Sequence, residues 1–270
     1  MEGIRVWVGI AAVILLLGGG GTAGFLIGMD SESDSGPAPA PPTRTVERTV
    51  TEKHVVVRDS ERRLTPPNRW SGPGFRVIEI EPGPAVPVRD APGGRTLKRF
   101  DDETELGSPR VLWVAERRGR WLGVVAPELG NNRIGWIRSD PERLRFGTTS
   151  YSMRVDLSDR VVELRRGDRT VRRVIVSVGR FGSGTPAGQF AVTDIVTRGL
   201  SDTYGCCAIA LSARQPNLPP GWIGGDRIAV HGWSGPVGAA ASGGCLRATN
   251  RDLRRLIQRV PLGAPVFIAA

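Results

Sequence analysis

The 270-residue chain has few of the residues that form disulfides or bind metals. Its three cysteines, Cys206, Cys207 and Cys245, are too few for a disulfide framework. In an exported protein, an odd number of cysteines also leaves at least one thiol free. The chain has only two histidines, His54 and His231. Any chemistry that needs an imidazole therefore has to use one of these two residues.

Aromatic residues and nucleotide-binding motifs are scarce as well. Only 6% of the residues are aromatic, and no stretch interleaves them with basic residues as nucleic-acid-binding proteins do. The loop GRFGSGTPAGQF lacks the Gly-Lys-Ser/Thr of a phosphate cradle. No period of 20–50 residues repeats along the chain. These absences argue against a nucleic-acid partner, a nucleotide enzyme and a repeat architecture.

Positive charge, glycine and proline are abundant. The formal net charge is +10, carried almost entirely by arginine. Such a charge is typical of a solvated surface, and the alternative is attraction to an acidic polymer such as an anionic cell envelope. The 36 glycines and 21 prolines indicate many turns between short strands. We therefore expect a mainly β fold.

The N-terminal part predicts a membrane anchor followed by a linker. Residues 6–28, VWVGIAAVILLLGGGGTAGFLIG, carry no charge and are long enough to cross about 30 Å of hydrocarbon as a helix. Arg5 precedes this run and acidic residues follow it, which favours a single-pass chain whose body lies outside the cell membrane, on the cell-wall side. We expect an anchor in residues 1–29, with a cleaved signal peptide as the alternative. Residues 30–70 are polar and proline-rich, which predicts a disordered linker.

Residues 71–147 show short alternating runs between turns, including FRVIEIEPG, RVLWVAERRGRWLGVVAP and IGWIRSD. Runs of period two predict a small antiparallel barrel or meander. The pattern VPVRDAPGG, GRWLGVVAP and GWI resembles bacterial SH3-like domains. That resemblance implies a small β domain that either binds the cell wall or acts as a spacer without a ligand.

Residues 148–270 form the second predicted domain. The segments SMRVDL, RVVELRR and TVRRVIVSVG predict three strands joined by tight turns, and FAVTDIV, IAVHG and PVFIAA predict further strands. The segment TNRDLRRLIQRV predicts a helix that begins with a capping-box-like pair, Thr249 and Asp252, and stops at Pro261. Its apolar face would consist of Leu253, Leu256, Ile257 and Val260.

Cys245 lies fourteen positions after His231, the only histidine of the second domain. A cysteine nucleophile needs a group that accepts its proton, and a nearby imidazole can do this. His231 ends an apolar strand, so its ring would project from a rigid edge. Gly243 and Gly244 allow a sharp turn into Cys245, and such a turn can point backbone N–H groups at an oxyanion. These residues form a candidate site for acyl transfer.

Two other interpretations stay open for these residues. A single free cysteine is usually a small buried hydrophobic residue, and a single histidine is usually structural. Alternatively, Cys206, Cys207, Cys245 and His231 make up a Cys₃His zinc set. Adjacent cysteines in a strand point to opposite faces, however, and zinc sites generally use C-x₂₋₄-C spacing. Under these interpretations the protein is a non-catalytic wall-binding or zinc-stabilised interaction protein.

The segment HGWSGPVGAAASGGCLRATNRDL resembles the signature of the L,D-transpeptidase (YkuD-type) catalytic domain. That signature places a His-Gly at a strand end, then G-x-A-x-S-x-G-C-[IVL]-R, then Asn-x-Asp at the start of a helix. The matching positions are His231, Gly232, Gly238, Ala240, Ser242, Gly244, Cys245, Leu246, Arg247, Asn250 and Asp252. Upstream, TPAGQF matches the T-P-x-G-x-F turn of the family. The resemblance covers the 120 residues from Tyr151 to Ala270.

The resemblance implies a C-terminal β-sandwich with a short helix, and an enzyme that cross-links peptidoglycan stem peptides. Cys245 would attack the carbonyl of a stem tetrapeptide and release D-alanine, leaving a thioester. An amine would resolve the thioester into a cross-link, whereas water would make the enzyme a carboxypeptidase. His231 would act as the base, and the backbone N–H groups of Gly244 and Cys245 would hold the oxyanion. No metal or organic cofactor is required.

Other matching residues are expected to contact the substrate. They are Arg247, Ser242, Gly232 and Gly243. Arg247 would lower the thiol pKa or bind a stem carboxylate, with simple structural pairing as the alternative, and Ser242 would mainly orient the turn.

The chain departs from the family pattern at three points. Gly243 stands where many relatives have a second histidine. The His-to-Cys interval is short, so a lid-like loop at 233–241 should be tight. The pair Cys206 and Cys207 has no counterpart in the pattern, and we expect two neighbouring strand residues there. A vicinal disulfide and a thiol near the active site are the alternatives.

Overall fold

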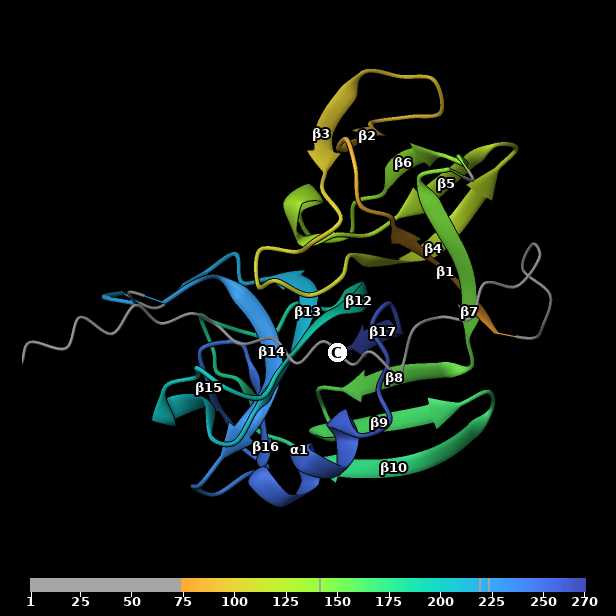
Figure 1. The fold of residues 1–270 in the computed structure, drawn as a ribbon. Coiled ribbons are helices and arrows are strands. Elements are labelled where there is room, and N and C mark those ends of the chain that lie inside the picture. The colour runs from red at the N-terminus through yellow and green to blue at the C-terminus, as the bar shows by residue number, and fades with distance from the viewer. Residues whose placement is uncertain (1–73, 141, 219, 223) are drawn as a thin grey trace, which may run out of the picture. The chain divides into compact units, whose positions relative to one another are not determined.

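The computed structural model describes residues 74–140, 142–218, 220–222 and 224–270, and all of them belong to one compact unit. The predicted anchor and linker lie outside the described residues. Within the described part, no helix is both long enough and apolar enough to cross a membrane. Two large sheets account for most of this part, so the expectation of a mainly β fold is confirmed (Figure 1).

The first sheet, called here the upstream sheet, has seven antiparallel strands. In spatial order they are β3 (Thr96–Phe100), β2 (Val86–Arg89), β6 (Gly135–Arg138), β5 (Trp121–Val124), β4 (Val111–Arg118), β1 (Phe75–Ile80) and β7 (Leu144–Thr149). Alternation is clear in β2, where Val86 and Val88 are buried and the residues between and after them are half-buried. The core includes Phe100, Leu122 and Ile137, each at most 1% exposed.

The alternating pattern predicts five of these strands but not β3 or β7. Strand β3 buries only Phe100 among its five residues, so it offers no alternation to detect. Strand β7, LRFGTT, is interrupted by a glycine and two half-buried residues in succession. The resemblance of this region to SH3-like domains, and the boundary between the two predicted domains, stay predictions.

The second sheet, the C-terminal sheet, has eight strands. In spatial order they are β10 (Arg169–Ile175), β9 (Val161–Arg166), β8 (Tyr151–Asp156), β17 (Pro265–Ala269), β12 (Gly188–Val196), β13 (Ala208–Arg214), β14 (Arg227–Trp233) and β16 (Leu246–Thr249). Two neighbouring pairs, β8 with β17 and β14 with β16, are parallel. A separate parallel pair joins β11 (Val178–Gly179) to β15 (Ala240–Ser242).

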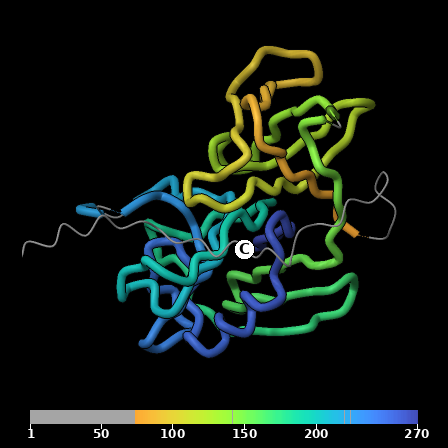
Figure 2. The backbone as a smooth tube through the Cα atoms, viewed as in Figure 1, coloured from red at the N-terminus to blue at the C-terminus, as the bar shows by residue number. Residues whose placement is uncertain are grey.

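Strands that are distant in sequence become neighbours in the C-terminal sheet. The last strand, β17, lies between β8 and β12, and the backbone trace follows the chain back to this central place (Figure 1, Figure 2). The pairing of β14 with β16 places His231 opposite Arg247 and Val230 opposite Leu246. Strands β13 and β16 are not predicted from the sequence pattern, although both border the site described below.

The helix α1 (Asn250–Ile257) begins where its sequence predicts and ends at Ile257, before the expected stop at Pro261. Thr249 is the N-cap, and its hydroxyl accepts the backbone N–H of Asp252 at 3.1 Å. This hydrogen bond satisfies one of the amide groups that a helix start leaves unpaired. Leu253 and Leu256 are fully buried beneath the helix, and they anchor it against the sheet core.

The two sheets are in direct apolar contact. The ring of Trp113 in β4 meets the ring of Phe267 in β17 edge-to-face, with centroids 5.6 Å apart. Phe75 lies against the same phenylalanine with a centroid distance of 6.1 Å. Val125 and Ala191 complete this cluster, which therefore contains residues of both sheets. Aromatic pairs of this geometry stabilise a contact beyond the area that they bury.

Candidate active site

His231 is held in one orientation inside β14. It is 3% exposed and lies two residues before the end of the strand, not at the end as the sequence suggests. Its Nδ1 is 2.8 Å from the carbonyl oxygen of Gly232. Because a carbonyl oxygen only accepts hydrogen bonds, Nδ1 carries the proton and Nε2 keeps a free lone pair. Burial lowers the pKa of His231 to about 4, and the charge of Arg247 acts in the same direction. The imidazole is therefore a neutral base near pH 7.

Cys245 lies between β15 and β16, one residue before Leu246. Its Sγ is 3.8 Å from the backbone carbonyl oxygen of Arg227, at the start of β14. Burial raises the pKa of this thiol, while the backbone of Ala229 and the charge of Arg247 act against the rise. The residue is the only free cysteine within the described part of the chain. In the resting site, Cys245 is therefore a protonated thiol and His231 a neutral imidazole.

The turn before the cysteine is held by four hydrogen bonds that involve side chains. The Ser242 hydroxyl donates to the carbonyl of Cys245 at 2.6 Å and accepts the N–H of Gly244 at 3.1 Å. The Thr185 hydroxyl donates to the carbonyl of Gly244 at 2.7 Å. The fourth bond comes from Gln215, which binds the carbonyl of Gly243 at 2.9 Å. Ser242 is 1% exposed, and its hydroxyl both donates and accepts a hydrogen bond within the turn. It therefore orients the turn, as expected, and the structure does not support its assignment to the substrate.

This arrangement corrects the oxyanion assignment. Gly244 has a φ of +123°, a conformation that favours glycine, as the sequence suggests for a sharp turn. Its N–H, however, donates to the Ser242 hydroxyl and does not point freely into the site. The sequence could not indicate this, because the hydroxyl reaches back over the turn only in the folded conformation. The other donor that the resemblance implies is the N–H of Cys245.

Gln215 and Tyr204 belong to the site, but the sequence does not predict either of them. Gln215 follows β13 directly and is 5% exposed. Its Nε2 donates to the carbonyls of Ser183 and Gly184, each at 3.1 Å, as well as to Gly243. The Tyr204 ring packs against the imidazole of His231, with centroids 5.0 Å apart. Neither residue has a local motif, and the T-P-x-G-x-F turn is the only sequence signal nearby.

Arg247, two residues after Cys245, stacks on an aromatic ring. Its guanidinium carbon is 4.1 Å from the centroid of the Trp233 ring, and one terminal nitrogen reaches the carbonyl of Ala241 at 3.5 Å. Its Nε is buried without a hydrogen-bond partner in the described residues. No ion pair to Arg247 is found among those residues either. Its positive charge is thus held by an aromatic face and is not neutralised by a carboxylate.

A small cavity of about 50 Å³ joins these groups. Its lining includes Tyr204, Gln215, Leu218, Trp222, Arg227, His231, Gly243, Cys245 and Arg247. The space admits only a few water molecules. No described residue of the loop 233–241, the expected lid, lines the cavity. Leu218 and Trp222, from the segment after Gln215, line the cavity where the lid was expected. Each of these two residues is 43% exposed.

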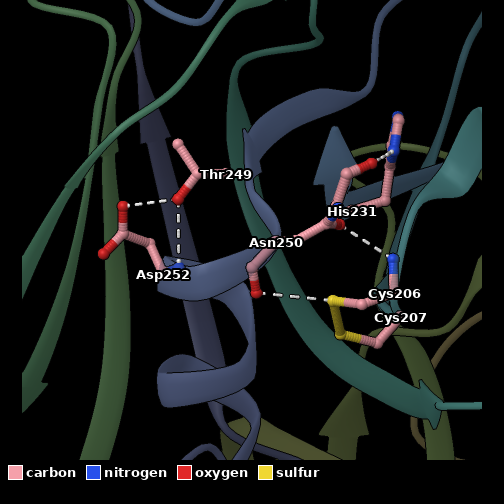
Figure 3. The surroundings of a disulfide bond; sticks show 7 residues. Cys206, Cys207, His231, Thr249, Asn250 and Asp252 are labelled. Carbon is pink, nitrogen blue, oxygen red and sulfur yellow. Dashed lines mark hydrogen bonds between the residues drawn. A yellow bond between two sulfur atoms is a disulfide. The ribbon is translucent and has the colours of Figure 1, made fainter. Parts of the chain in front are cut away.

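Cys206 and Cys207 form a vicinal disulfide, which Figure 3 draws together with His231 and Asn250. They precede β13 and are not strand residues, which corrects the expectation for this pair. The N–H of Cys206 donates to Oδ1 of Asn250 at 2.9 Å, and the N–H of Gly232 donates to the carbonyl of Cys207 at 3.0 Å. A Cβ atom on Gly232 would lie 2.8 Å from the Cys206 nitrogen.

Two expectations change because of this disulfide. Gly232 packs against the disulfide and does not line the cavity, so the structure does not support its assignment to the substrate. The Cys₃His zinc set would need the thiolates of Cys206 and Cys207, and both sulfurs are already bonded to each other. Among the described residues, no group of three or more metal-binding side chains is present.

Comparisons with known proteins identify the family of the C-terminal region. Residues 150–268 match the YkuD family, described as the L,D-transpeptidase catalytic domain. The chain is 31% identical over 130 residues to the L,D-transpeptidase YkuD of Bacillus licheniformis, across 45% of this chain and 67% of the relative. It is 26% identical over 123 residues to the Bacillus subtilis protein of the same name, with the same two coverages, 45% and 67%. A solved L,D-transpeptidase from Xylanimonas cellulosilytica is 24% identical with a TM-score of 0.34, and the match covers 45% of this chain and 61% of that chain. The chain thus belongs to the YkuD family of L,D-transpeptidases.

Proposed function

We propose that the chain is a peptidoglycan L,D-transpeptidase whose nucleophile is Cys245 and whose base is His231. The observation that carries this proposal is the shared cavity, which is lined by both the half-buried thiol of Cys245, just before β16, and the neutral imidazole of His231 in the neighbouring strand β14. Membership of the L,D-transpeptidase family supplies the reaction class. The substrate is a peptidoglycan stem tetrapeptide, and no cofactor takes part.

The first half-reaction forms a thioester. Sγ of Cys245 attacks the carbonyl carbon of the L-centred residue in the donor stem, while the thiol proton moves to Nε2 of His231. Because the thiol pKa is raised and the imidazole pKa is lowered, the neutral pair is the resting state. Proton transfer therefore accompanies the attack and does not precede it. The protonated imidazole then gives the proton to the amine of the departing D-alanine.

The second half-reaction resolves the thioester. An amine from a neighbouring stem attacks the thioester carbonyl, and Nε2 of His231 takes a proton from this amine. The carbon–sulfur bond breaks, and the thiolate recovers its proton from the imidazolium. The product is a cross-link between two stems. If water attacks in place of the amine, the same steps give a carboxypeptidase.

Substrate binding requires two further contributions from the site. The cavity of about 50 Å³ is too small for a peptide, so Leu218 and Trp222 have to move aside when a stem enters. Arg247, whose charge has no carboxylate partner in the described residues, then binds a carboxylate of the stem. This role is favoured over structural pairing. The N–H of Cys245 is the backbone donor for the oxyanion.

We also propose that residues 6–28 anchor the chain in the cell membrane, with the enzyme on the cell-wall side. Support comes from the length and the lack of charge of that segment alone. Fractionation of cells, with protease added to intact spheroplasts, tests this placement. Recovery in the cytosolic fraction, or protection from the protease, contradicts it.

The function is tested with the full chain and purified disaccharide-tetrapeptide. We expect mass spectrometry to detect released D-alanine and a cross-linked dimer. Cys245→Ala should reduce both products by at least about 1,000-fold, as removal of a nucleophile does. Ser158→Ala, at an exposed turn, serves as the control. D-alanine without a dimer would mean hydrolysis, and no D-alanine from protein with a titratable Cys245 thiol would refute the function.

A further inference from the structure

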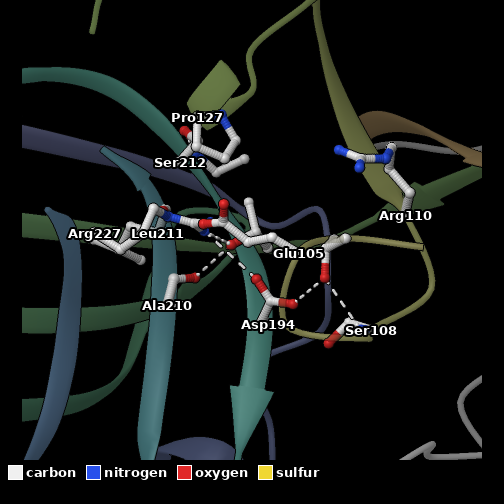
Figure 4. A network of polar contacts seen from close by, with 12 residues as sticks. Glu105, Ser108, Arg110, Pro127, Asp194, Ala210, Leu211, Ser212 and Arg227 are labelled. Carbon is white, nitrogen blue, oxygen red and sulfur yellow. Dashed lines mark hydrogen bonds and ion pairs between the residues drawn. The ribbon is translucent and has the colours of Figure 1, made fainter. Parts of the chain in front are cut away.

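Two loops of the upstream sheet contact the strand ends that border the active site. One loop joins β3 to β4 and contains Thr104 and Glu105, and the other contains the 3-10 turn Pro127–Leu129 and Asn131. They meet the C-terminal sheet where β13 ends and where β14 begins. Figure 4 shows Glu105 reaching between the strands toward Arg227. These contacts are polar and specific, unlike the apolar cluster around Phe267.

Arg227 connects the upstream sheet to the nucleophile. Its guanidinium donates to Oε1 of Glu105 and, through Nε, to the backbone carbonyl of Leu211 at 3.0 Å. The side chain is only 11% exposed. Its own backbone carbonyl is the group that lies 3.8 Å from Sγ of Cys245. Because the guanidinium and this carbonyl both belong to Arg227, the contacts of the guanidinium restrict where the carbonyl beside Sγ can lie.

Arg214 forms the parallel connection on the next strand. Its backbone N–H and carbonyl are both bound by the side-chain amide of Asn131, at 2.8 and 2.7 Å. Its Nε donates to the carbonyl of Pro127 at 2.8 Å, and one terminal nitrogen reaches Oε2 of Glu105 at 3.5 Å. The next residue is Gln215, which holds the turn that carries Cys245.

Glu105 is the centre of this network because its carboxylate, 43% exposed, pairs with both arginines. It is the residue that contacts both arginines, with one carboxylate oxygen for each. The other carboxylate near Arg227 is Asp194, which is fully buried, lies 3.5 Å away and also accepts the hydroxyl of Thr104. Without Glu105, the mostly buried charge of Arg227 would lose its closest partner. A buried charge that loses its partner reorients or admits water.

We infer that Glu105 is a positioning residue for acyl transfer at Cys245, acting through Arg227 and Arg214. The inference rests on the proposed function and assigns the upstream sheet a part in it. Glu105 touches neither the thiol nor the imidazole. Through Arg227, Glu105 fixes the start of β14. Through Arg214, at the end of β13, it supports Gln215, which binds the turn before Cys245. The upstream sheet is thus a component of the catalytic unit and not only a spacer or a wall-binding module.

The test compares Glu105→Gln with Glu116→Gln in the full chain. Glu116 pairs with Arg118 on an exposed face of the same upstream sheet, with side chains 37% and 61% exposed, so it is a matched control. For Glu105→Gln we expect kcat to fall by about tenfold while KM stays within about twofold, because alignment is lost and binding is not. Glu105→Asp, which keeps the charge, should recover part of the rate.

A second readout separates positioning from a general loss of structure. The rate of Cys245 alkylation by iodoacetamide is measured against pH. In Glu105→Gln the alkylation profile should move to lower pH, since a loosened β14 lets water reach the thiol and reduces the burial that raises its pKa. A thiol that ionises more readily but transfers acyl groups more slowly is the signature of lost positioning. Glu116→Gln should change neither quantity.

The outcomes distinguish this inference from the proposed function. If Glu105→Gln matches Glu116→Gln in kcat and in its alkylation profile, the inference is overturned while the function stands. If the wild-type chain makes no product, the function fails, and the alkylation profiles still decide whether Glu105 positions the thiol. If Glu105→Gln does not fold, Asn131→Ala tests the same positioning through Arg214 and Gln215. An unchanged profile in that variant also overturns it.

Discussion

Lowering the pH should destabilise the folded protein through His231. Burial holds the pKa of this residue at about 4, against an ordinary value of 6.5. As the pH falls through that window, the unfolded chain binds a proton that the folded chain does not. The free energy of unfolding therefore decreases on acidification. The loss that His231 causes reaches its full size once the pH lies below the pKa of the folded state. The difference between the two pKa values amounts to about 3 kcal/mol at 1.36 kcal/mol per unit.

A double comparison isolates this contribution from the carboxylates that titrate in the same range. Urea unfolding of the wild type and of His231→Asn is followed by circular dichroism at about pH 7 and about pH 4.5. Asparagine does not titrate, and its amide can still donate to the Gly232 carbonyl as Nδ1 does. Between the two pH values, the wild type should lose about 2 to 3 kcal/mol more than the variant. Equal losses would show that His231 titrates normally, and the neutral resting base would be wrong.

Three further predictions concern the surroundings of the cysteine. Gln215→Glu keeps the shape of the side chain but removes the amide that donates to three carbonyls. Urea unfolding should show a free energy of unfolding lower by about 2 to 4 kcal/mol, whereas the control Asn217→Asp, on the adjoining loop, should change it by less than about 0.5 kcal/mol. Arg247→Gln should raise KM for the tetrapeptide by about tenfold, and an unchanged KM in steady-state assays would exclude carboxylate binding there. Replacing Cys206 and Cys207 by alanine should lower the free energy of unfolding by only about 1 kcal/mol, because a disulfide between adjacent residues closes almost no loop. A loss several times larger in urea unfolding would mean that the disulfide constrains more of the chain than its own turn.

The sequence predicted those parts of the fold whose signals are local. Sequence patterns identified β1, β2 and, among the strands around the active site, β14, and the cap at Thr249 identified the start of α1. Strands such as β3, with one buried residue, have no such signal. The candidate nucleophile and base could be named because cysteine and histidine are rare in this chain, and because the residues around them match a spaced motif.

The sequence by itself thus determined the candidate residues, namely a cysteine after a glycine turn and the one histidine of the C-terminal domain. The tertiary structure alone decided how these groups are held. Gln215 and Cys245 are far apart along the chain, and the register of β13, β14 and β16 brings Gln215 to the turn before Cys245. Glu105 reaches this region only because the loop between β3 and β4 contacts Arg214 and Arg227. Whether the Gly244 N–H is free, whether Cys206 and Cys207 are joined, and which pKa His231 adopts all depend on burial and on contacts across strands. Local patterns report propensity and period, whereas these properties arise from groups that meet only when the sheets close.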